Sequence, residues 1–232
     1  VGIDAVALKP TEVELSRAAD LAASTLVIDY EGREAFPDDD TLRALAESAT
    51  VRVTTPVRAD GFDPMGDDSL SDSIPENAGR VLVAGNGAYL SEEEGQRAVA
   101  PRLGEGADRY PDAWVGTEGV ERIALATGAT QFELLSRSTE RDVRALRAAG
   151  FDGELALYAP TVLTDDEDAV LDAVGAYVSR RAPVRRALPD DCATDSSATG
   201  RAREVLLAAS TDFAIVGDEA TVRGRVEGLH GA

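Results

Sequence analysis

The sequence predicts an α/β fold, a single (β/α)8 barrel formed by residues 1–232. Short apolar runs of strand length recur along the chain, polar or glycine residues close each run, and most of the intervening stretches have amphipathic helical spacing. The eight runs are residues 1–10, 25–30, 50–57, 80–86, 112–117, 130–136, 154–160 and 212–218. Eight strand-then-helix units are the repeat of a closed barrel, whose ligands bind where the strands end. An open doubly wound sheet has the same alternation and differs in strand order.

The first half of the chain contains four of these runs and the start signals of two helices. Thr11 is placed to cap the first helix, and Asp40 is placed to cap the second. Pro56 lies near the end of the third run, where a bulge or a cis peptide bond would accommodate it. Residues 58–79 lack periodicity, so we expect an irregular loop there, either a lid over the site or a solvated insertion.

The second half of the chain alternates loops and helices in the same way. Residues 101–111 and 182–197 are expected to be loops, because turn-forming and polar residues dominate them. Gly150 is expected to end one helix as its C-terminal cap. The expected helices are residues 121–126, 139–149, 165–181, 198–210 and 219–229.

The charge of the chain argues against nucleic acid and anionic membranes as partners. The net charge is −20, the acidic residues are spread throughout, and no cluster of positive charge stands out. A surface of this kind stays hydrated in high salt, where repulsion between like charges is screened. No apolar stretch approaches the roughly 20 residues of a membrane span, and no signal-peptide pattern opens the chain. We therefore expect a cytoplasmic protein.

Cysteine and histidine are each present once, which limits the available chemistry. Cys192 has no second cysteine with which to form a disulfide within the chain or a multi-cysteine metal site. His230 lies two residues from the end, so a zinc site built on several imidazoles cannot form within one chain. A Ser-His-Asp triad would need that terminal histidine. We predict no metal site.

Lys9 is the single lysine among 23 basic residues, and it lies at the end of the first predicted strand. On that side of a barrel, a lysine supplies a titratable amine or a contact to phosphate. A surface lysine without such a role is the alternative.

Two carboxylates, Asp29 and Glu31, end the second predicted strand, with Tyr30 between them. Paired carboxylates serve acid–base chemistry, although residues here also cap helices or bind loop amides. Side-chain alternation sends Asp29 and Tyr30 to opposite faces, unless the strand has already ended and both turn into the barrel mouth.

Two glycine pairs follow predicted strands, namely Gly85 with Gly87 and Gly116 with Gly119. Glycines before a helix allow backbone amides to approach a phosphate, so all four are candidate cofactor-binding residues. Neither pair completes a dinucleotide fingerprint or a P-loop, and plain tight turns would place glycines in the same way.

The C-terminal third of the chain resembles the luciferase-like monooxygenase superfamily, which includes flavin-dependent monooxygenases and reductases that use the deazaflavin coenzyme. Residues 156–169, beginning Ala-Leu-Tyr-Ala-Pro-Thr-Val, resemble the seventh strand of that family and the acidic start of the next helix. Residues 214–229, beginning Ala-Ile-Val-Gly-Asp-Glu, resemble its last strand, glycine turn and closing helix. The acidic composition is similar to that of proteins from halophilic archaea.

The resemblance extends more thinly to three upstream segments. Residues 27–30, Val-Ile-Asp-Tyr, fall where the family often has an Asp-His pair. Residues 54–57, Thr-Thr-Pro-Val, fall where it carries a bulge with an unusual cis peptide that supports the cofactor ring. Residues 115–124 correspond to a turn and helix near the cofactor phosphate.

The resemblance implies a barrel mouth that binds FMN or a deazaflavin coenzyme together with a small-molecule substrate, and it favours a homodimer. Tyr30 would donate a hydrogen bond to substrate or cofactor, and Asp29 would orient nearby groups. The residues expected to line the cofactor pocket are Asp29, Tyr30, Thr55, Pro56, Gly116 and Gly119, with Gly85 and Gly87 as further phosphate contacts. Two alternatives stay open: a degenerate, non-catalytic barrel used for binding or assembly, and a phosphometabolite lyase or isomerase that uses Lys9.

Overall fold

A computed structural model describes residues 3–57, 69–83, 99–116 and 128–231 of the chain. The chain forms two compact units. The N-terminal unit contains residues 3–133 and 150–156, and the C-terminal unit contains residues 1–2, 134–149 and 157–232. We describe each unit by itself.

Seven of the eight predicted runs form strands of one sheet, and their order in the sheet follows their order in the chain. Each pair of neighbours from β1 to β6 is parallel. A doubly wound sheet reverses its strand order at a switch point, so the observed order excludes that alternative. The strands are β1 (Ala5–Leu8), β2 (Thr25–Ile28), β3 (Thr50–Pro56), β4 (Gly79–Val83), β5 (Trp114–Gly116), β6 (Gln131–Leu134) and β7 (Leu155–Tyr158).

The eighth run also contains a strand, β9 (Ile215–Val216), but this strand belongs to a separate two-stranded sheet. Its parallel partner is β8 (Thr161–Val162), which directly follows the seventh run and was not predicted as a separate strand. The Ile215 amide donates to the Pro160 carbonyl at 2.8 Å, and the Gly217 amide donates to the Val162 carbonyl at 3.2 Å. The structure therefore establishes an α/β fold with a seven-stranded sheet in barrel order, while the expected eightfold sheet is not formed by the described residues.

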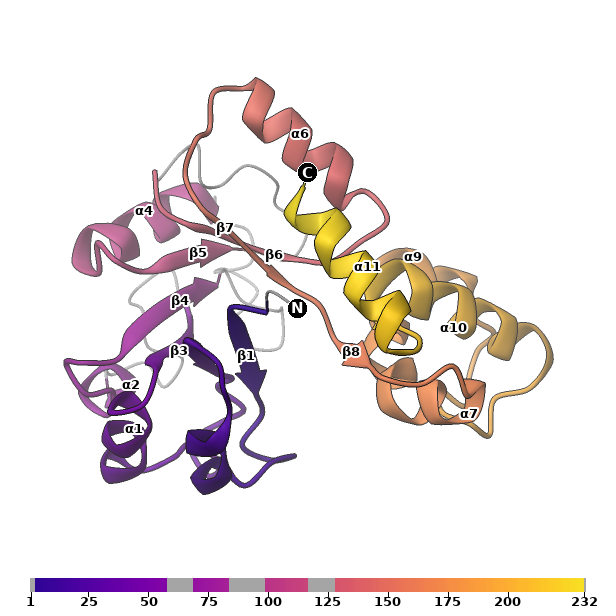
Figure 1. The fold of residues 1–232 in the computed structure, drawn as a ribbon, viewed down its shortest axis with the longest axis horizontal. Coiled ribbons are helices and arrows are strands. Elements are labelled where there is room, and N and C mark those ends of the chain that lie inside the picture. The colour runs from indigo at the N-terminus through magenta and orange to yellow at the C-terminus, as the bar shows by residue number, and fades with distance from the viewer. Residues whose placement is uncertain (1–2, 58–68, 84–98, 117–127, 232) are drawn as a thin grey trace. The chain divides into compact units, whose positions relative to one another are not determined.

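One face of strands β1 to β3 packs against helical segments. Leu26, Ile28, Val51 and Val53 from the strands lie in one buried cluster with apolar residues of η1 (Leu15–Asp20) and α1 (Asp39–Ala46). Figure 1 shows α1 beside the strands of this unit. We call this side of the sheet the helix-covered face. Since successive residues of a strand alternate, the neighbouring positions lie on the opposite face.

The starts of the first two helical segments differ from the prediction. Asp38, and not Asp40, caps α1: its carboxylate accepts a hydrogen bond from the Thr41 amide at 2.8 Å. Thr11 caps no helix, because the first helical segment is the 3-10 helix η1, which begins four residues later. The predicted caps were wrong by a few residues because several acids and hydroxyls stand at each start and any of them has the required oxygen.

Residues 101–111 were predicted to be a loop, but most of them belong to helix α4 (Val99–Arg109). Pro101 lies in the first turn of this helix, where a missing amide hydrogen is tolerated. Leu103 is fully buried against Leu82 and Val115 of the sheet. Packing against the sheet therefore outweighs the low helix propensity of proline and glycine. A short helix, α2 (Ser69–Asp72), also lies within the predicted irregular loop.

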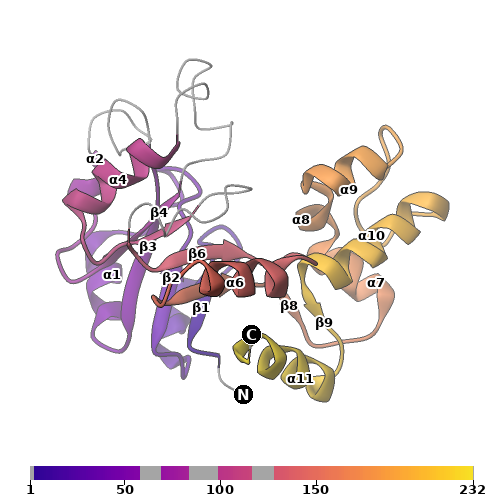
Figure 2. The same ribbon diagram turned by 90° about the horizontal axis from the view of Figure 1, so that it is seen from above.

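The C-terminal unit is mainly helical and contains the helices that the sequence predicted there (Figure 2). The expected helix over residues 165–181 is observed as α7 (Glu167–Val170), a π-type turn η3 (Leu171–Gly175) and α8 (Ala176–Ser179). Gly175 is required at this turn because the Thr194 carbonyl oxygen occupies the place of a β-carbon. The other predicted helices are observed as α6 (Thr139–Ala148), α10 (Gly200–Phe213) and α11 (Glu219–His230). Residues 182–197 were predicted to be a loop, but the first of them form helix α9 (Ala182–Ala187), whose Val184 is buried in an apolar cluster.

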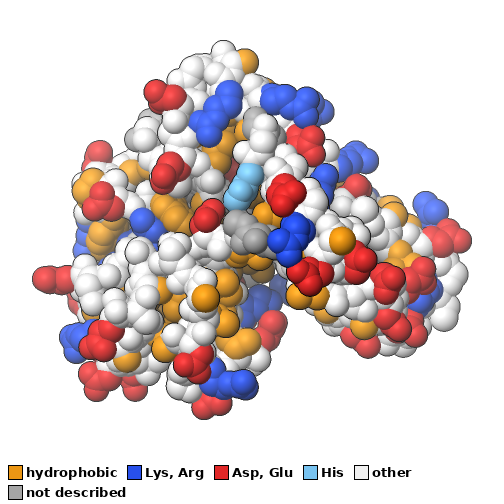
Figure 3. Space-filling view, in the orientation of Figure 1, with side chains coloured by type: hydrophobic (Ala, Val, Ile, Leu, Met, Phe, Trp, Pro, Cys, Tyr) orange, Lys and Arg blue, Asp and Glu red, His pale blue; other side chains and the backbone are white. Residues whose placement is uncertain are grey.

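The surface of the molecule has the mixed, acidic character expected from its composition. Figure 3 shows Asp and Glu side chains distributed over the visible face, with Lys and Arg side chains between them. Several of these charges pair within a helix, for example Arg43 with Asp39 at 2.5 Å and Arg223 with Glu219 at 2.6 Å. Among the described residues, no helix is both long enough and apolar enough to cross a membrane.

Replacing Gly116 with alanine should destabilise the protein. The Phe132 carbonyl oxygen lies where the new β-carbon would be, and strand backbone cannot move aside as a side chain can. We expect Gly116→Ala to lower the free energy of unfolding by about 1–3 kcal/mol, measured by chemical denaturation. Gly104→Ala is the matched control, because no heavy atom lies within 4 Å of its β-carbon and alanine favours the helix α4. Equal effects of the two changes would contradict this account.

Candidate active site at the carboxyl ends of β1 to β3

Asp29 and Thr54 form a hydrogen-bonded pair where strands β2 and β3 end. The Thr54 hydroxyl donates to Oδ1 of Asp29 at 2.8 Å and accepts a hydrogen bond from the Tyr30 amide at 2.7 Å. The Asp29 amide donates to the Leu8 carbonyl at 2.8 Å, which continues the ladder to β1. Asp29 is therefore held from both sides, at the end of the sheet where barrel enzymes carry their chemistry.

Burial raises the pKa of the Asp29 carboxyl above its ordinary value, and the negative charge of Glu31 acts in the same direction. The hydrogen bond from Thr54 and the positive charge of Lys9 act in the opposite direction and offset only part of this rise. A carboxyl group whose pKa is raised by burial holds a proton closer to neutral pH, as an acid–base group requires.

The loops after β1 and β2 are joined by Glu31. One carboxylate oxygen of Glu31 accepts hydrogen bonds from the Thr11 amide at 3.0 Å and the Thr11 hydroxyl at 2.6 Å. The Lys9 carbonyl accepts the amides of Glu12 and Val13, which closes a tight turn. The Lys9 ammonium group pairs with Glu12 at 2.9 Å, and the lysine side chain stays 30% exposed. This turn keeps Lys9 near enough to Asp29 to influence its carboxyl.

Tyr30 and Thr55 do not face the same side as Asp29. Tyr30 belongs to the buried cluster on the helix-covered face, and its ring packs against Phe36 with 5.8 Å between the centroids. The Thr55 side chain is fully buried, and its hydroxyl donates to the Val53 carbonyl at 3.2 Å. The expectation that both residues line a pocket at the mouth is therefore corrected: strand alternation continues to the ends of β2 and β3 and turns these side chains into the core.

Pro56 and Gly116 occupy ordinary strand positions. Pro56 is the last residue of β3, in register with Val83, and the described chain contains no cis peptide bond. The expected cis peptide at this proline is therefore not formed. Gly116 allows β5 to approach the Phe132 carbonyl closely. Gly85, Gly87 and Gly119 lie outside the described residues, and their expected role stays a prediction.

Thr54 and Thr11 are the site residues that sequence reasoning missed. Thr54 precedes the residue that was chosen, and counting alternate positions from the apolar Val51 and Val53 would have placed it on the face of Asp29. Thr11 was assigned to a helix start, and its contact with Glu31 across 20 residues leaves no sequence signal.

The part of the chain that the structure describes contains no group of three or more His, Cys, Asp or Glu residues that could hold a metal ion. Cys192 is a free, half-buried thiol packed at the margin of an apolar cluster in the C-terminal unit. At the described site, Asp29 supplies a carboxyl group and Lys9 supplies an ammonium group.

Changing Asp29 to asparagine should stabilise the fold at neutral pH. A raised pKa in the folded state means that the contribution of Asp29 to stability is fully present below the unfolded value, near 3.8, and is lost as pH rises through the folded value. The free energy of unfolding of Asp29→Asn should therefore rise relative to the unmodified protein between pH 4 and pH 7, as measured by urea denaturation.

The control for this change is Asp38→Asn, which should have the opposite sign. Hydrogen bonds from Thr41 lower the pKa of Asp38, so its contribution is present at neutral pH and is lost on acidification. If Asp29→Asn loses stability towards neutral pH as Asp38→Asn does, the burial argument for Asp29 is wrong.

Comparison with known protein families gives a match, which covers residues 1–232, to a family of unknown function, DUF7388. Searches of curated proteins and of solved structures give no match. The matched description assigns neither an activity nor a ligand to these residues. With its whole length covered by this match, the chain belongs to the family of unknown function DUF7388.

Proposed function

We propose that this protein is an enzyme that moves a proton on a small polar substrate, with Asp29 as the acid–base group. The observation that carries the proposal is the half-buried carboxyl of Asp29, oriented by Thr54 at the carboxyl end of the sheet. A general base needs a fixed geometry and a pKa shifted towards the working pH. Asp29 has both features.

Lys9 supplies a positive charge beside this carboxyl and favours an acidic substrate. Its positive charge acts to lower the pKa of the Asp29 carboxyl, and its ammonium group forms an ion pair with the more exposed Glu12. A substrate carboxylate or phosphate would replace Glu12 as the partner of Lys9, while Asp29 removes a proton from a hydroxyl-bearing carbon next to a carbonyl group of the substrate and returns it to the carbonyl carbon, so that the carbonyl moves by one carbon. This is the reaction of an isomerase.

Exchange of substrate hydrogen with solvent tests this proposal. The protein is incubated in deuterated buffer at molar KCl with 2-hydroxy acids, 2-oxo acids and sugar phosphates, and deuterium uptake is followed by mass spectrometry. We expect uptake into at least one compound, and a rate at least about 100-fold lower for Asp29→Asn. Arg43→Gln on helix α1 is the control and should retain the rate, because the ion pairs of Arg43 with described residues, Asp39 and Asp40, lie within that helix. Uptake equal to the rate without protein for every compound would contradict the proposal.

A second candidate is a flavin- or deazaflavin-dependent oxidoreductase with a luciferase-like (β/α)8 barrel. The C-terminal segments support it: β9 is followed by a glycine with φ of +141° at position 217, then by helix α11, which Asp218 caps. The sequential order of β1 to β7 is also that of such a barrel. However, Tyr30 and Thr55 face the core and the described residues of β3 contain no cis peptide bond, so these residues do not provide the ring support that the resemblance implies.

Titration with FMN and with a deazaflavin coenzyme, followed by flavin absorbance and fluorescence, tests the second candidate. Binding should give a saturable change, and Lys9→Gln should weaken it if the lysine contacts the coenzyme. Arg43→Gln should bind as the unmodified protein does. The absence of a saturable change with either coenzyme would exclude this candidate. If deuterium exchange were also absent, the non-catalytic barrel would be the remaining interpretation.

A further inference from the structure

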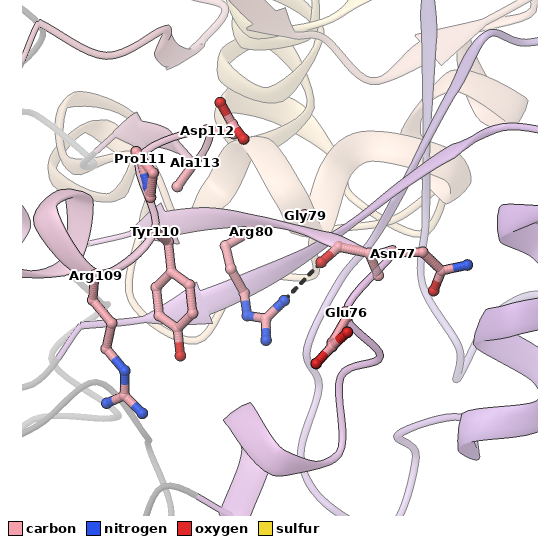
Figure 4. Close-up of a pocket in the computed structure, with 10 residues that line it drawn as sticks. Glu76, Asn77, Gly79, Arg80, Arg109, Tyr110, Pro111, Asp112 and Ala113 are labelled. Carbon is pink, nitrogen blue, oxygen red and sulfur yellow. Dashed lines mark hydrogen bonds between the residues drawn. The ribbon is translucent and has the colours of Figure 1, made fainter.

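A pocket of about 320 Å³ opens at the amino ends of strands β4 and β5, away from the strand ends that carry Asp29. It lies within the N-terminal unit, between residues 76–80 and residues 109–113. Figure 4 shows Arg80, Arg109 and Tyr110 in its wall, with their polar ends on the same side. We propose that this pocket binds a small molecule through a single carboxylate or phosphate group.

Two guanidinium groups converge on the ring of Tyr110. The guanidinium carbon of Arg80 lies 4.8 Å from the ring centroid, and that of Arg109 lies 5.4 Å from it. Arg80 is 7% exposed, and its Nη1 donates to the Ala78 carbonyl at 2.8 Å. The ring and this carbonyl fix the planar group, so its fork is oriented before a ligand arrives. A preorganised guanidinium matches the two oxygens of a carboxylate or phosphate.

A third arginine, Arg52, does not line the pocket but contacts two residues that do, Gly79 and Asp112. Nη1 of Arg52 donates to the Asp112 carbonyl at 2.8 Å, and the guanidinium stacks on Trp114 at 4.6 Å. The side chain of Arg52 passes close to Gly79 of β4. A β-carbon on residue 79 would lie only 2.8 Å from Nη1 of Arg52. Its Nε is a buried donor that finds no acceptor among the described residues. Burial lowers the pKa of both Arg52 and Arg80; of the two, only Arg80 lines the pocket.

Two carboxylates, Glu76 and Asp112, also line the pocket and set its selectivity. Their negative charges repel further negative charge on a ligand, so we do not expect the pocket to bind polyanions in general. A ligand with one oxyanion group can contact the arginines without bringing a second negative charge close to these acids. The side-chain amide of Asn77 also lines the pocket, and it suits a neutral hydroxyl or carbonyl on the same ligand.

The test is a titration of the whole protein with inorganic phosphate and, separately, with acetate and citrate, at constant ionic strength in KCl. Melting temperature and titration calorimetry are the readouts. We expect saturable binding of phosphate or acetate, with citrate weaker than the tighter of the two. The tighter of these two probes identifies the group that the pocket recognises.

Four variants make the result specific to the pocket. Arg109→Gln removes an exposed cation, and Arg80→Lys keeps the charge while removing the planar fork, so each should weaken binding at least about tenfold. Arg43→Gln on α1 should bind normally. Loss of binding in Lys9→Gln would place the anion at the proposed active site and would also overturn the proposal. Binding of equal strength in Arg109→Gln, or a shift that added KCl reproduces, would overturn the proposal.

Discussion

The register of the parallel sheet is the constraint on which the rest of the N-terminal unit depends. Each strand continues the hydrogen-bond ladder of its neighbour, and the Asp29 amide still donates to Leu8 after β2 has ended. This register fixes which side chains meet across strands and which face each one joins. Leu26 and Ile28 therefore enter the core under the helices, while Asp29 meets Thr54 on the opposite face.

Polar groups on that opposite face are held by specific partners rather than by apolar packing. Asp29 is fixed by Thr54, and Arg52 is fixed by the Asp112 carbonyl and the ring of Trp114. Burial of each group disfavours its charged form. A fold gains little stability from charged groups that are partly buried. Asp29 at the carboxyl end of β2 and Arg80 at the amino end of β4 are therefore the main structural argument for the two proposed sites.

The sequence was most informative where apolar residues cluster and least informative where single residues decide. Seven strands and most helices of the described chain were predicted, because burial of an apolar face imposes a regular pattern. Helix α4 was missed, because Pro101 and the glycines that follow it suggest a loop until Leu103 packs on the sheet. Lys9 and Asp29 were selected correctly as strand-end residues, whereas Tyr30 and Thr55 were assigned to the wrong face.

The sequence by itself determined the α/β class, the order of strands and helices, and the places where strands end, because these follow from local hydrophobic periodicity and turn residues. Only the tertiary structure decided the strand order in the sheet, which excludes a doubly wound fold. It also decided that Asp29 pairs with Thr54, that Glu31 holds Thr11, and that Arg80 and Arg109 share the ring of Tyr110. The first two contacts join residues 25 and 20 positions apart in the chain, and no local pattern encodes which strand ends become neighbours.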